Sequence, residues 1–297
     1  MRFVLLGEQA TGKSSLLVAL YGALVNRRAG DLRLVRTVDE VEFLSRGLQA
    51  FGRQESLQRT DLDSDAKLLV DVARGDEIVT LDLPDRSGEL LKNMLDARIW
   101  EPVLRRQIGH AEGAMLFLRG DHVVAGETPE AGFELLGPGV EVYEPGRADD
   151  VPLPWTPVLM PPDVRTVDLL QAVLDERASA LPVAIIISAY DSVSSPVPDW
   201  NQVISPTADR NRVSSAALAP PAWLAQHMPL LDQFLDSNSD RLPHAVFGVS
   251  AQGGDFSAGL ARGLVDEDPW DRAYVVCPDD ERGTLAEPVL WLLNAKR

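Results

Sequence analysis

The chain has 297 residues, of which 45% are hydrophobic and 25% charged, a composition typical of a globular protein. Its net charge of −17 argues against nucleic acid and anionic membranes as partners, because both require a basic protein surface. A single cysteine, Cys277, excludes an intrachain disulfide framework, and the apolar runs are too short to span a membrane. We therefore expect a cytoplasmic protein that binds neither nucleic acid nor membrane.

The first predicted element is a buried strand at residues 2–6, which runs directly into Gly7-Glu8-Gln9-Ala10-Thr11-Gly12-Lys13-Ser14. This run is a complete G-x-x-x-x-G-K-[ST] phosphate-binding loop, and residues 14–28 after it have a helical pattern. The glycines let backbone N–H groups point at phosphate oxygens, Lys13 adds a positive charge, and the Ser14 hydroxyl can reach Mg²⁺. We expect a nucleoside triphosphate to be bound by Gly7, Gln9, Ala10, Thr11, Gly12, Lys13, Ser14 and Ser15.

An extra amphipathic helix is predicted inside an insertion at about residues 36–58, after the first helix. Apolar residues recur there at helical spacing, so one face of this helix should be buried. The positions on that face are Val38, Val41, Leu44, Leu48 and Phe51.

Two strand-like runs follow at residues 67–72 and 77–83, joined by the short polar turn Arg74-Gly75-Asp76. Such a turn with a central glycine is typical of an antiparallel hairpin. The next element is predicted to be a helix with a kink near Pro102. Its apolar stripe consists of Leu91, Leu95, Ile99 and Val103.

Three continuous apolar runs at residues 114–118, 183–187 and 245–249 complete the predicted sheet, with helical patterns between them. Runs of this kind are what a parallel sheet buried on both faces requires. The last helix opens with a capping-box pattern at residues 284–287. We predict an α/β, three-layer P-loop NTPase fold whose mostly parallel six-stranded sheet has one antiparallel strand.

We expect residues 1–297 to form a single domain with long surface insertions. Besides the one at 36–58, segments at about 120–165, 192–222 and 252–283 are rich in Gly, Pro, Ser or acidic residues. Tryptophans in these segments would either anchor a protein partner or pin the loops to the body, and pinning is the simpler interpretation. They are Trp155, Trp200 and Trp270.

A D-x-x-G pattern, formed by Asp85 and Gly88, follows the second hairpin strand. The Asp85 carboxylate is placed to hold a Mg²⁺-bound water, and the Gly88 N–H to approach a γ-phosphate. An alternative interpretation is a turn aspartate that caps the next helix. The phosphate loop and this pattern together leave ATPases, GTPases and kinases open.

The loops after the later strands narrow this choice. Ser188-Ala189-Tyr190-Asp191 follows the run at 183–187, and Ser250-Ala251-Gln252 follows the run at 245–249. With these motifs the chain resembles the small-GTPase-like (TRAFAC) branch of P-loop GTPases, which has [N/T]-K-x-D and S-A-[K/L] at these places. It is also similar to the double-GTPase type of bacterial conflict and signalling operons. The resemblance extends from residue 2 to the end of the chain.

The resemblance implies roles for individual residues. Asp191 would accept hydrogen bonds from guanine, and the N–H of Ala251, beside Ser250, would bind the guanine oxygen. Thr60, about eight residues before the second strand, would close over Mg²⁺ and the γ-phosphate, unless it merely ends a helix. Glu89 would stand near the place of the family's water-orienting glutamine. The catalytic candidates are Lys13, Thr60, Gly88 and Glu89, and the metal-binding candidates are Ser14, Thr60 and Asp85.

Several positions depart from the family's pattern. Ala189 replaces the lysine whose stem covers the base, and Ser188 replaces Asn or Thr, so guanine selectivity should rest largely on Asp191. Gln9 stands where many efficient small GTPases have glycine, and no glutamine follows Gly88.

The sequence thus predicts a Mg²⁺-dependent protein that binds GTP and GDP, hydrolyses GTP slowly and switches an unidentified protein partner. One alternative is a nucleotide-binding scaffold without useful turnover, which Gln9 and the missing glutamine after Gly88 suggest. The other is an ATP-using P-loop phosphotransferase, which the imperfect match at residues 188–191 leaves open.

Overall fold

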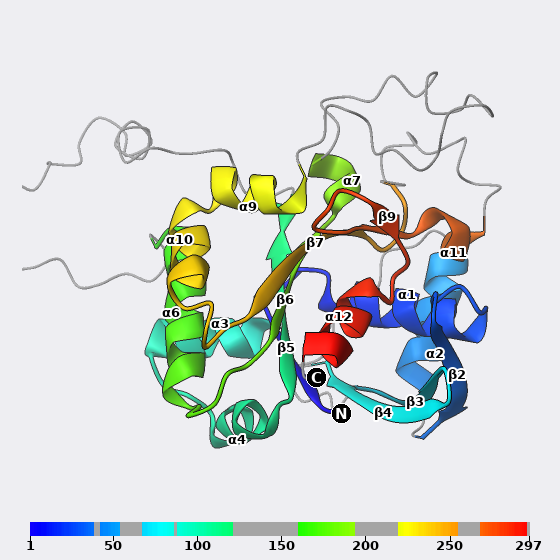
Figure 1. Cartoon of the computed structure of the whole chain (residues 1–297), viewed down its shortest axis with the longest axis horizontal. Coiled ribbons are helices and arrows are strands. Elements are labelled where there is room, and N and C mark those ends of the chain that lie inside the picture. The colour runs from blue at the N-terminus through cyan, green and yellow to red at the C-terminus, as the bar shows by residue number, and fades with distance from the viewer. Residues whose placement is uncertain are drawn as a thin grey trace, which may run out of the picture.

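A computed structural model describes residues 1–38, 42–53, 67–85, 88–120, 160–193, 219–254 and 268–295 (Figure 1). Its main sheet has six strands in the order β1-β5-β6-β7-β8-β9, and the first four are parallel. β8 pairs antiparallel with both neighbours, so it is the one strand that runs the other way. The predicted α/β class and mostly parallel six-stranded sheet are therefore confirmed. The strands are β1 (Phe3–Leu6), β5 (Gly113–Arg119), β6 (Val183–Ser188), β7 (His244–Ser250), β8 (Tyr274–Val276) and β9 (Arg282–Gly283).

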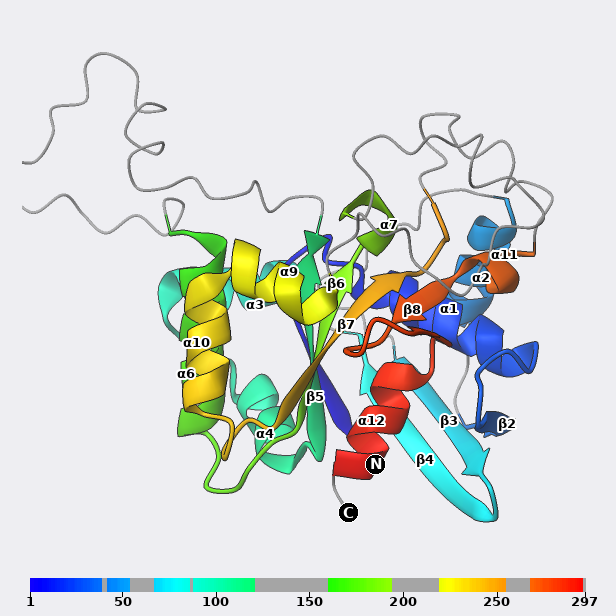
Figure 2. The ribbon, with the colours of Figure 1, turned by 45° about the horizontal axis from the view of Figure 1, so that its top comes forward.

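Helices cover both faces of this sheet and form a layer on each side (Figures 1 and 2). Alternate residues of one strand enter different cores: Met115 and Phe117 of β5 face one side, and Leu116 and Leu118 face the other. This alternation explains why the strand is apolar along its whole length. The first core includes α1 (Lys13–Val25) and α12 (Glu287–Ala295), and the second includes α3 (Gly88–Ala97), α4 (Pro102–His110), α6 (Pro162–Asp175), α9 (Pro220–His227) and α10 (Pro229–Ser237).

A second, antiparallel sheet of three strands contains β2 (Leu32–Thr37), β3 (Lys67–Arg74) and β4 (Glu77–Pro84). The predicted hairpin is therefore present, but its strands do not belong to the main sheet. β4 lies parallel to the start of β1, and a single backbone bridge joins Arg2 to Asp82. The side chains of these two residues also form an ion pair at 2.6 Å.

Three strands were not predicted from the sequence: β2, β8 and β9. β2 has arginines among its apolar residues because it is an edge strand with a largely exposed face, and β8 and β9 are too short to give a periodic signal. Two helices begin within the last residues of predicted insertions, since α6 starts at Pro162 and α9 at Pro220, and both continue beyond them. The segment 252–283 contains α11 (Pro269–Arg272), β8 and β9.

The predicted kinked helix is wrong, because the structure has two separate helices there. α3 ends at Ala97, Arg98 adopts a left-handed φ of 53°, and Pro102 begins α4. Proline at the first helical position is favoured, whereas inside a helix it removes a hydrogen bond. Ile99, expected on the buried stripe, is consequently 70% exposed.

The inserted amphipathic helix is confirmed as α2 (Glu42–Gly52), which buries Leu44 and Phe51. Val38 lies before the helix and is 45% exposed, and Val41 lies outside the described residues. α2 packs against α1: a Cβ atom placed on Gly47 would lie 2.4 Å from Cγ2 of Val18.

Two smaller predictions can also be compared with the structure. A Cβ atom on Gly22 of α1 would lie 2.1 Å from the Trp270 ring, so this tryptophan does pin its segment to the body; Trp155 and Trp200 lie outside the described residues. Only half of the predicted capping box forms: the Thr284 backbone N–H donates to the Glu287 carboxylate at 3.4 Å, but the Glu287 N–H donates to the Thr284 carbonyl oxygen and not to its hydroxyl. Within the described parts of the chain, every helix is too short or too polar to cross a membrane.

Substitution of Gly47 by leucine should destabilise the protein by about 1–3 kcal/mol, because Val18 is fully buried and cannot move aside. Urea unfolding would measure the difference. The control is Gly52→Ala in the same helix, where an added Cβ meets nothing within 4 Å. Equal unfolding free energies for the two variants would contradict the packing of α2 on α1.

Candidate nucleotide-binding site

The phosphate loop lies between β1 and the N-terminus of α1. Gly12 has a φ of 83° and Ala10 a φ of 61°, so the loop curls through two left-handed residues before the helix begins at Lys13. A Cβ atom on Gly12 would lie 3.0 Å from Cβ of Ser188, which brings this loop against the end of β6. Backbone N–H groups and the helix dipole make such a helix start favourable for anions.

Lys13 is held inside the curl of this loop, with only 6% of its surface exposed. Its Nζ donates to the carbonyl oxygens of Gly7 at 2.7 Å and Glu8 at 2.8 Å. Burial lowers the pKa of Lys13 to about 8, although the carboxylates of Asp85 and Glu8 act in the opposite direction. A longer contact of 3.5 Å joins Nζ to the Thr11 hydroxyl, so the loop holds a poorly solvated cation on neutral oxygen atoms.

The Ser14 hydroxyl donates to Oδ2 of Asp85 at 2.6 Å, and Asp85, just after β4, is 1% exposed. A hydroxyl and a carboxylate suit Mg²⁺, a hard cation that prefers oxygen ligands. The described residues contain no cluster of three or more His, Cys, Asp or Glu that could hold a metal alone. Thr60, the third metal candidate, lies outside the described residues.

The backbone of Gly88, the first residue of α3, lies directly on the phosphate loop. A Cβ atom there would lie 2.3 Å from the backbone N of Gln9 and from the backbone C of Glu8, so only glycine fits. The two residues of the D-x-x-G pattern therefore both reach the phosphate loop. Glu89 stands in the first turn of α3 with an exposed side chain.

The motifs expected to bind the base leave the sheet at the same edge. Ser188 of β6 is in register with Val249 of β7, and Tyr190 in α7 (Tyr190–Val193) packs against Gly248, where a Cβ atom would lie 2.5 Å from its ring. Tyr190 is fully buried, and burial raises the pKa of its phenol. Asp191, the next residue, is half-buried at the start of this short helix.

In the second of these motifs, Ser250 is buried and its hydroxyl accepts a hydrogen bond from the Gly253 N–H at 3.0 Å. Ala251, between them, is half-buried. This hydrogen bond shapes the turn after β7 that carries the expected N–H donor. The structure thus brings both expected base motifs and the phosphate loop to one edge of the sheet. Ser15, the last of the expected phosphate-binding residues, is half-buried in the first turn of α1.

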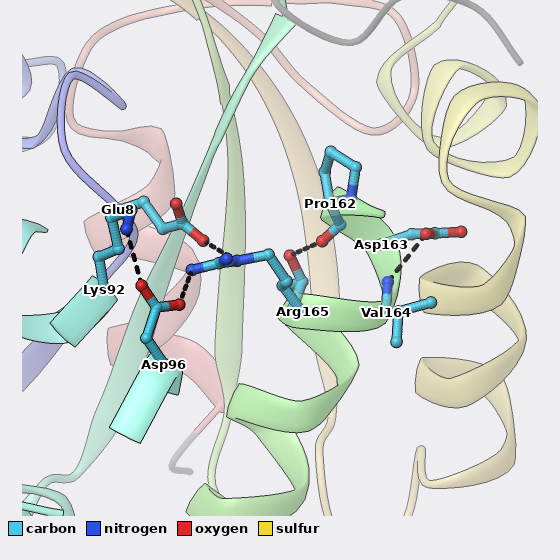
Figure 3. A network of polar contacts seen from close by, with 8 residues as sticks. Glu8, Lys92, Asp96, Pro162, Asp163, Val164 and Arg165 are labelled. Carbon is cyan, nitrogen blue, oxygen red and sulfur yellow. Dashed lines mark hydrogen bonds and ion pairs between the residues drawn. The ribbon is translucent and has the colours of Figure 1, made fainter. Parts of the chain in front are cut away.

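An ion-pair network behind the phosphate loop was not predicted from the sequence (Figure 3). Arg165 of α6, 11% exposed, binds Glu8 at 2.7 Å and Asp96 of α3 at 3.0 Å. Asp96 also accepts a hydrogen bond from Lys92, which lowers the pKa of its carboxyl. Glu8, an acidic residue in a phosphate loop, indicates that a cation must be near. The sequence does not show which of the 28 lysines and arginines supplies this cation.

A phosphate loop at a helix start, with base motifs at the same sheet edge, defines a P-loop nucleotide-binding protein. The family model described as Double-GTPase 1 matches residues 4–202 and 210–292, and the chain belongs to this family. No curated protein matches the chain. The resemblance to the double-GTPase type is therefore confirmed, and membership of a GTPase family implies that the protein binds GTP.

The affinity for a non-hydrolysable GTP analogue should fall as the pH rises from about 7 to about 9. Lys13 is protonated below its pKa of about 8 and neutral above it, whereas phosphates require the charged form. Above this pKa, binding must take up a proton and weakens by at most tenfold per pH unit. Titrations over this range, with calorimetric measurement of proton uptake, would check this; constant affinity without proton uptake would contradict it.

Proposed function

We propose that the chain is a Mg²⁺-dependent GTPase that hydrolyses GTP slowly and works as a molecular switch. The observation that carries this proposal is the convergence of Lys13, Ser14 and Asp85 at the phosphate loop. An amine, a hydroxyl and a buried carboxylate at one helix start are what a Mg²⁺-bound triphosphate requires. Family membership supports the choice of GTP.

In the proposed reaction, water attacks the γ-phosphorus and the bond from this phosphorus to the β–γ bridging oxygen breaks, which leaves GDP and phosphate. Lys13 would exchange its carbonyl partners for phosphate oxygens and neutralise their charge. Ser14 and Asp85, with Thr60, would hold Mg²⁺, which supplies further neutralisation when bound. The Gly88 N–H would bind the γ-phosphate. Slow turnover is expected because Glu89, with its exposed side chain, replaces the water-orienting glutamine.

On the base side, we propose that Asp191 accepts hydrogen bonds from guanine and that the N–H of Ala251 binds the guanine oxygen. The adjacency of the loops that carry these residues supports this assignment. We also propose one domain over residues 1–297, a cytoplasmic location and an unidentified protein partner. The charge of −17 supports the absence of nucleic-acid and membrane partners.

A second candidate function is a nucleotide-binding scaffold without useful turnover. The close packing of Gly88 on Glu8 and Gln9 favours it, because this contact must loosen if water and a γ-phosphate are to be placed beside α3. Single-turnover measurement of phosphate release from bound GTP would separate the two functions. Release no faster than from GTP in buffer would favour the scaffold.

The base preference tests the proposed function. GTP and GDP should bind at least about tenfold more tightly than ATP and ADP, because a carboxylate facing adenine loses its hydrogen-bond partners at a cost of about 1–3 kcal/mol. Asp191→Asn should shift the preference towards xanthosine nucleotides. Lys13→Ala, checked for folding by its melting curve, should abolish triphosphate binding for every base. Equal affinity for ATP and GTP in the unmodified protein would instead favour the phosphotransferase.

Switching should alter hydrogen exchange in the loops that meet the γ-phosphate. We expect residues 85–95 and 36–62 to be more protected with Mg²⁺ and a non-hydrolysable GTP analogue than with GDP, since the expected contacts of Gly88 and Thr60 need that phosphate. The helix α12, which lies on the opposite face of the sheet from α3, serves as an internal reference. If changes were confined to residues 7–14, the protein would bind nucleotide without switching.

A further inference from the structure

The strand order β1-β5-β6 places the end of β5 between two loops of the proposed site. The phosphate loop follows β1, and the loop that carries Asp191 follows β6. All three strands are parallel, so their carboxyl ends meet at one edge of the sheet. A nucleotide with its phosphates on the first loop and its base at Asp191 must pass across the end of β5, whose last residue is Arg119.

The side chain of Arg119 reaches the phosphate loop from this position. Its Nη1 donates to the carbonyl oxygen of Ala10 at 3.3 Å, and the side chain is half-buried. On its other side, Arg119 is in register with Ser188 of β6. The guanidinium is thus anchored at the junction between the phosphate loop and the 188–191 motif.

The backbone directly after Arg119 is tightly packed at this junction. A Cβ atom on Gly120 would lie 2.3 Å from Cγ2 of Val193 and 3.0 Å from the carbonyl oxygen of Ser188. Gly120 is therefore pressed against the end of α7 and the end of β6. This packing holds the backbone position from which the Arg119 side chain extends.

The 188–191 motif itself offers no cation at this place, because its second residue is Ala189. We propose that Arg119 is a nucleotide-binding residue that covers the nucleoside part of the ligand and supplies the cationic side chain that the motif lacks. A planar guanidinium can stack on a base face as well as donate hydrogen bonds, so it suits this role. The proposal rests on the proposed binding of guanine nucleotides.

A purely structural role makes a different prediction. Ala10 has a left-handed φ of 61°, and Arg119 could serve only to hold its carbonyl group and the loop. Loss of that role would weaken every ligand of the phosphate loop, including inorganic tripolyphosphate, which has no nucleoside. Loss of a nucleoside contact would weaken GDP and GTP but leave tripolyphosphate binding unchanged.

The test measures GDP and tripolyphosphate affinities for the full chain and its variants. Arg119→Ala should weaken GDP about tenfold, equivalent to about 1.4 kcal/mol, and change tripolyphosphate by less than about twofold. Arg119→Lys should retain most of the GDP affinity. Arg105→Ala is the matched control, because Arg105 is a surface arginine of α4 paired with Glu176 and should leave both affinities unchanged.

A second-site rescue makes the test sharper. Arg119→Ala combined with Ala189→Lys should recover GDP affinity to within about threefold, since a cation returns to the junction from the neighbouring strand. Ala189 already carries a Cβ atom at a φ of 51°, so lysine adds no backbone strain beyond that of alanine. Melting curves would show that each variant is folded, and Arg119→Gln, which removes the charge but keeps much of the side-chain length, provides the measurement if Arg119→Ala does not fold.

Two results would overturn the proposal: unchanged GDP affinity in Arg119→Ala, or an equal loss of GDP and tripolyphosphate affinity. Either result leaves the proposed GTPase function standing, because the unmodified protein still binds GDP. Failure of the unmodified protein to bind GDP would instead overturn the proposed function together with this inference.

Discussion

The burial of a lysine inside the phosphate loop is the constraint around which the site is arranged. Lys13 has little contact with water, so its charge depends on loop carbonyl groups and on the carboxylates of Asp85 and Glu8. Glu8 in turn binds Arg165, and Arg165 binds Asp96. Charges therefore alternate from Lys13 to Asp96, and each charge in this series has an opposite neighbour. A bound polyphosphate would enter at the positive start of this series.

α3 contacts the phosphate loop near both ends of the helix. Gly88, at the start of α3, packs on the backbone of Glu8, and Asp96, near its end, reaches the side chain of Glu8 through Arg165. A displacement of Gly88 by a γ-phosphate would consequently act on a helix that is also held at its other end. This linkage gives the proposed switch a physical route from the nucleotide to α6.

Much of the fold could be read from the sequence because its signals are local. Each of the correctly predicted features occupies a short stretch of chain: the phosphate loop, the hairpin at β3 and β4, and the buried runs of β5, β6 and β7. The single kinked helix near Pro102 was wrong because apolar spacing continues through a break in the backbone. β2, β8 and β9 were missed because an exposed edge strand and very short strands lack periodicity.

The sequence by itself determined the phosphate loop, the two motifs that we propose bind the base, and the class of fold, since residue type and spacing along the chain encode them. Only the tertiary structure decided which distant residues meet them. Arg165 lies 157 positions from Glu8, and Arg119 lies 109 positions from Ala10. Such pairings depend on strand order and on the packing of helices on the sheet. Those features arise when the whole chain buries its apolar surface, and no short segment specifies them.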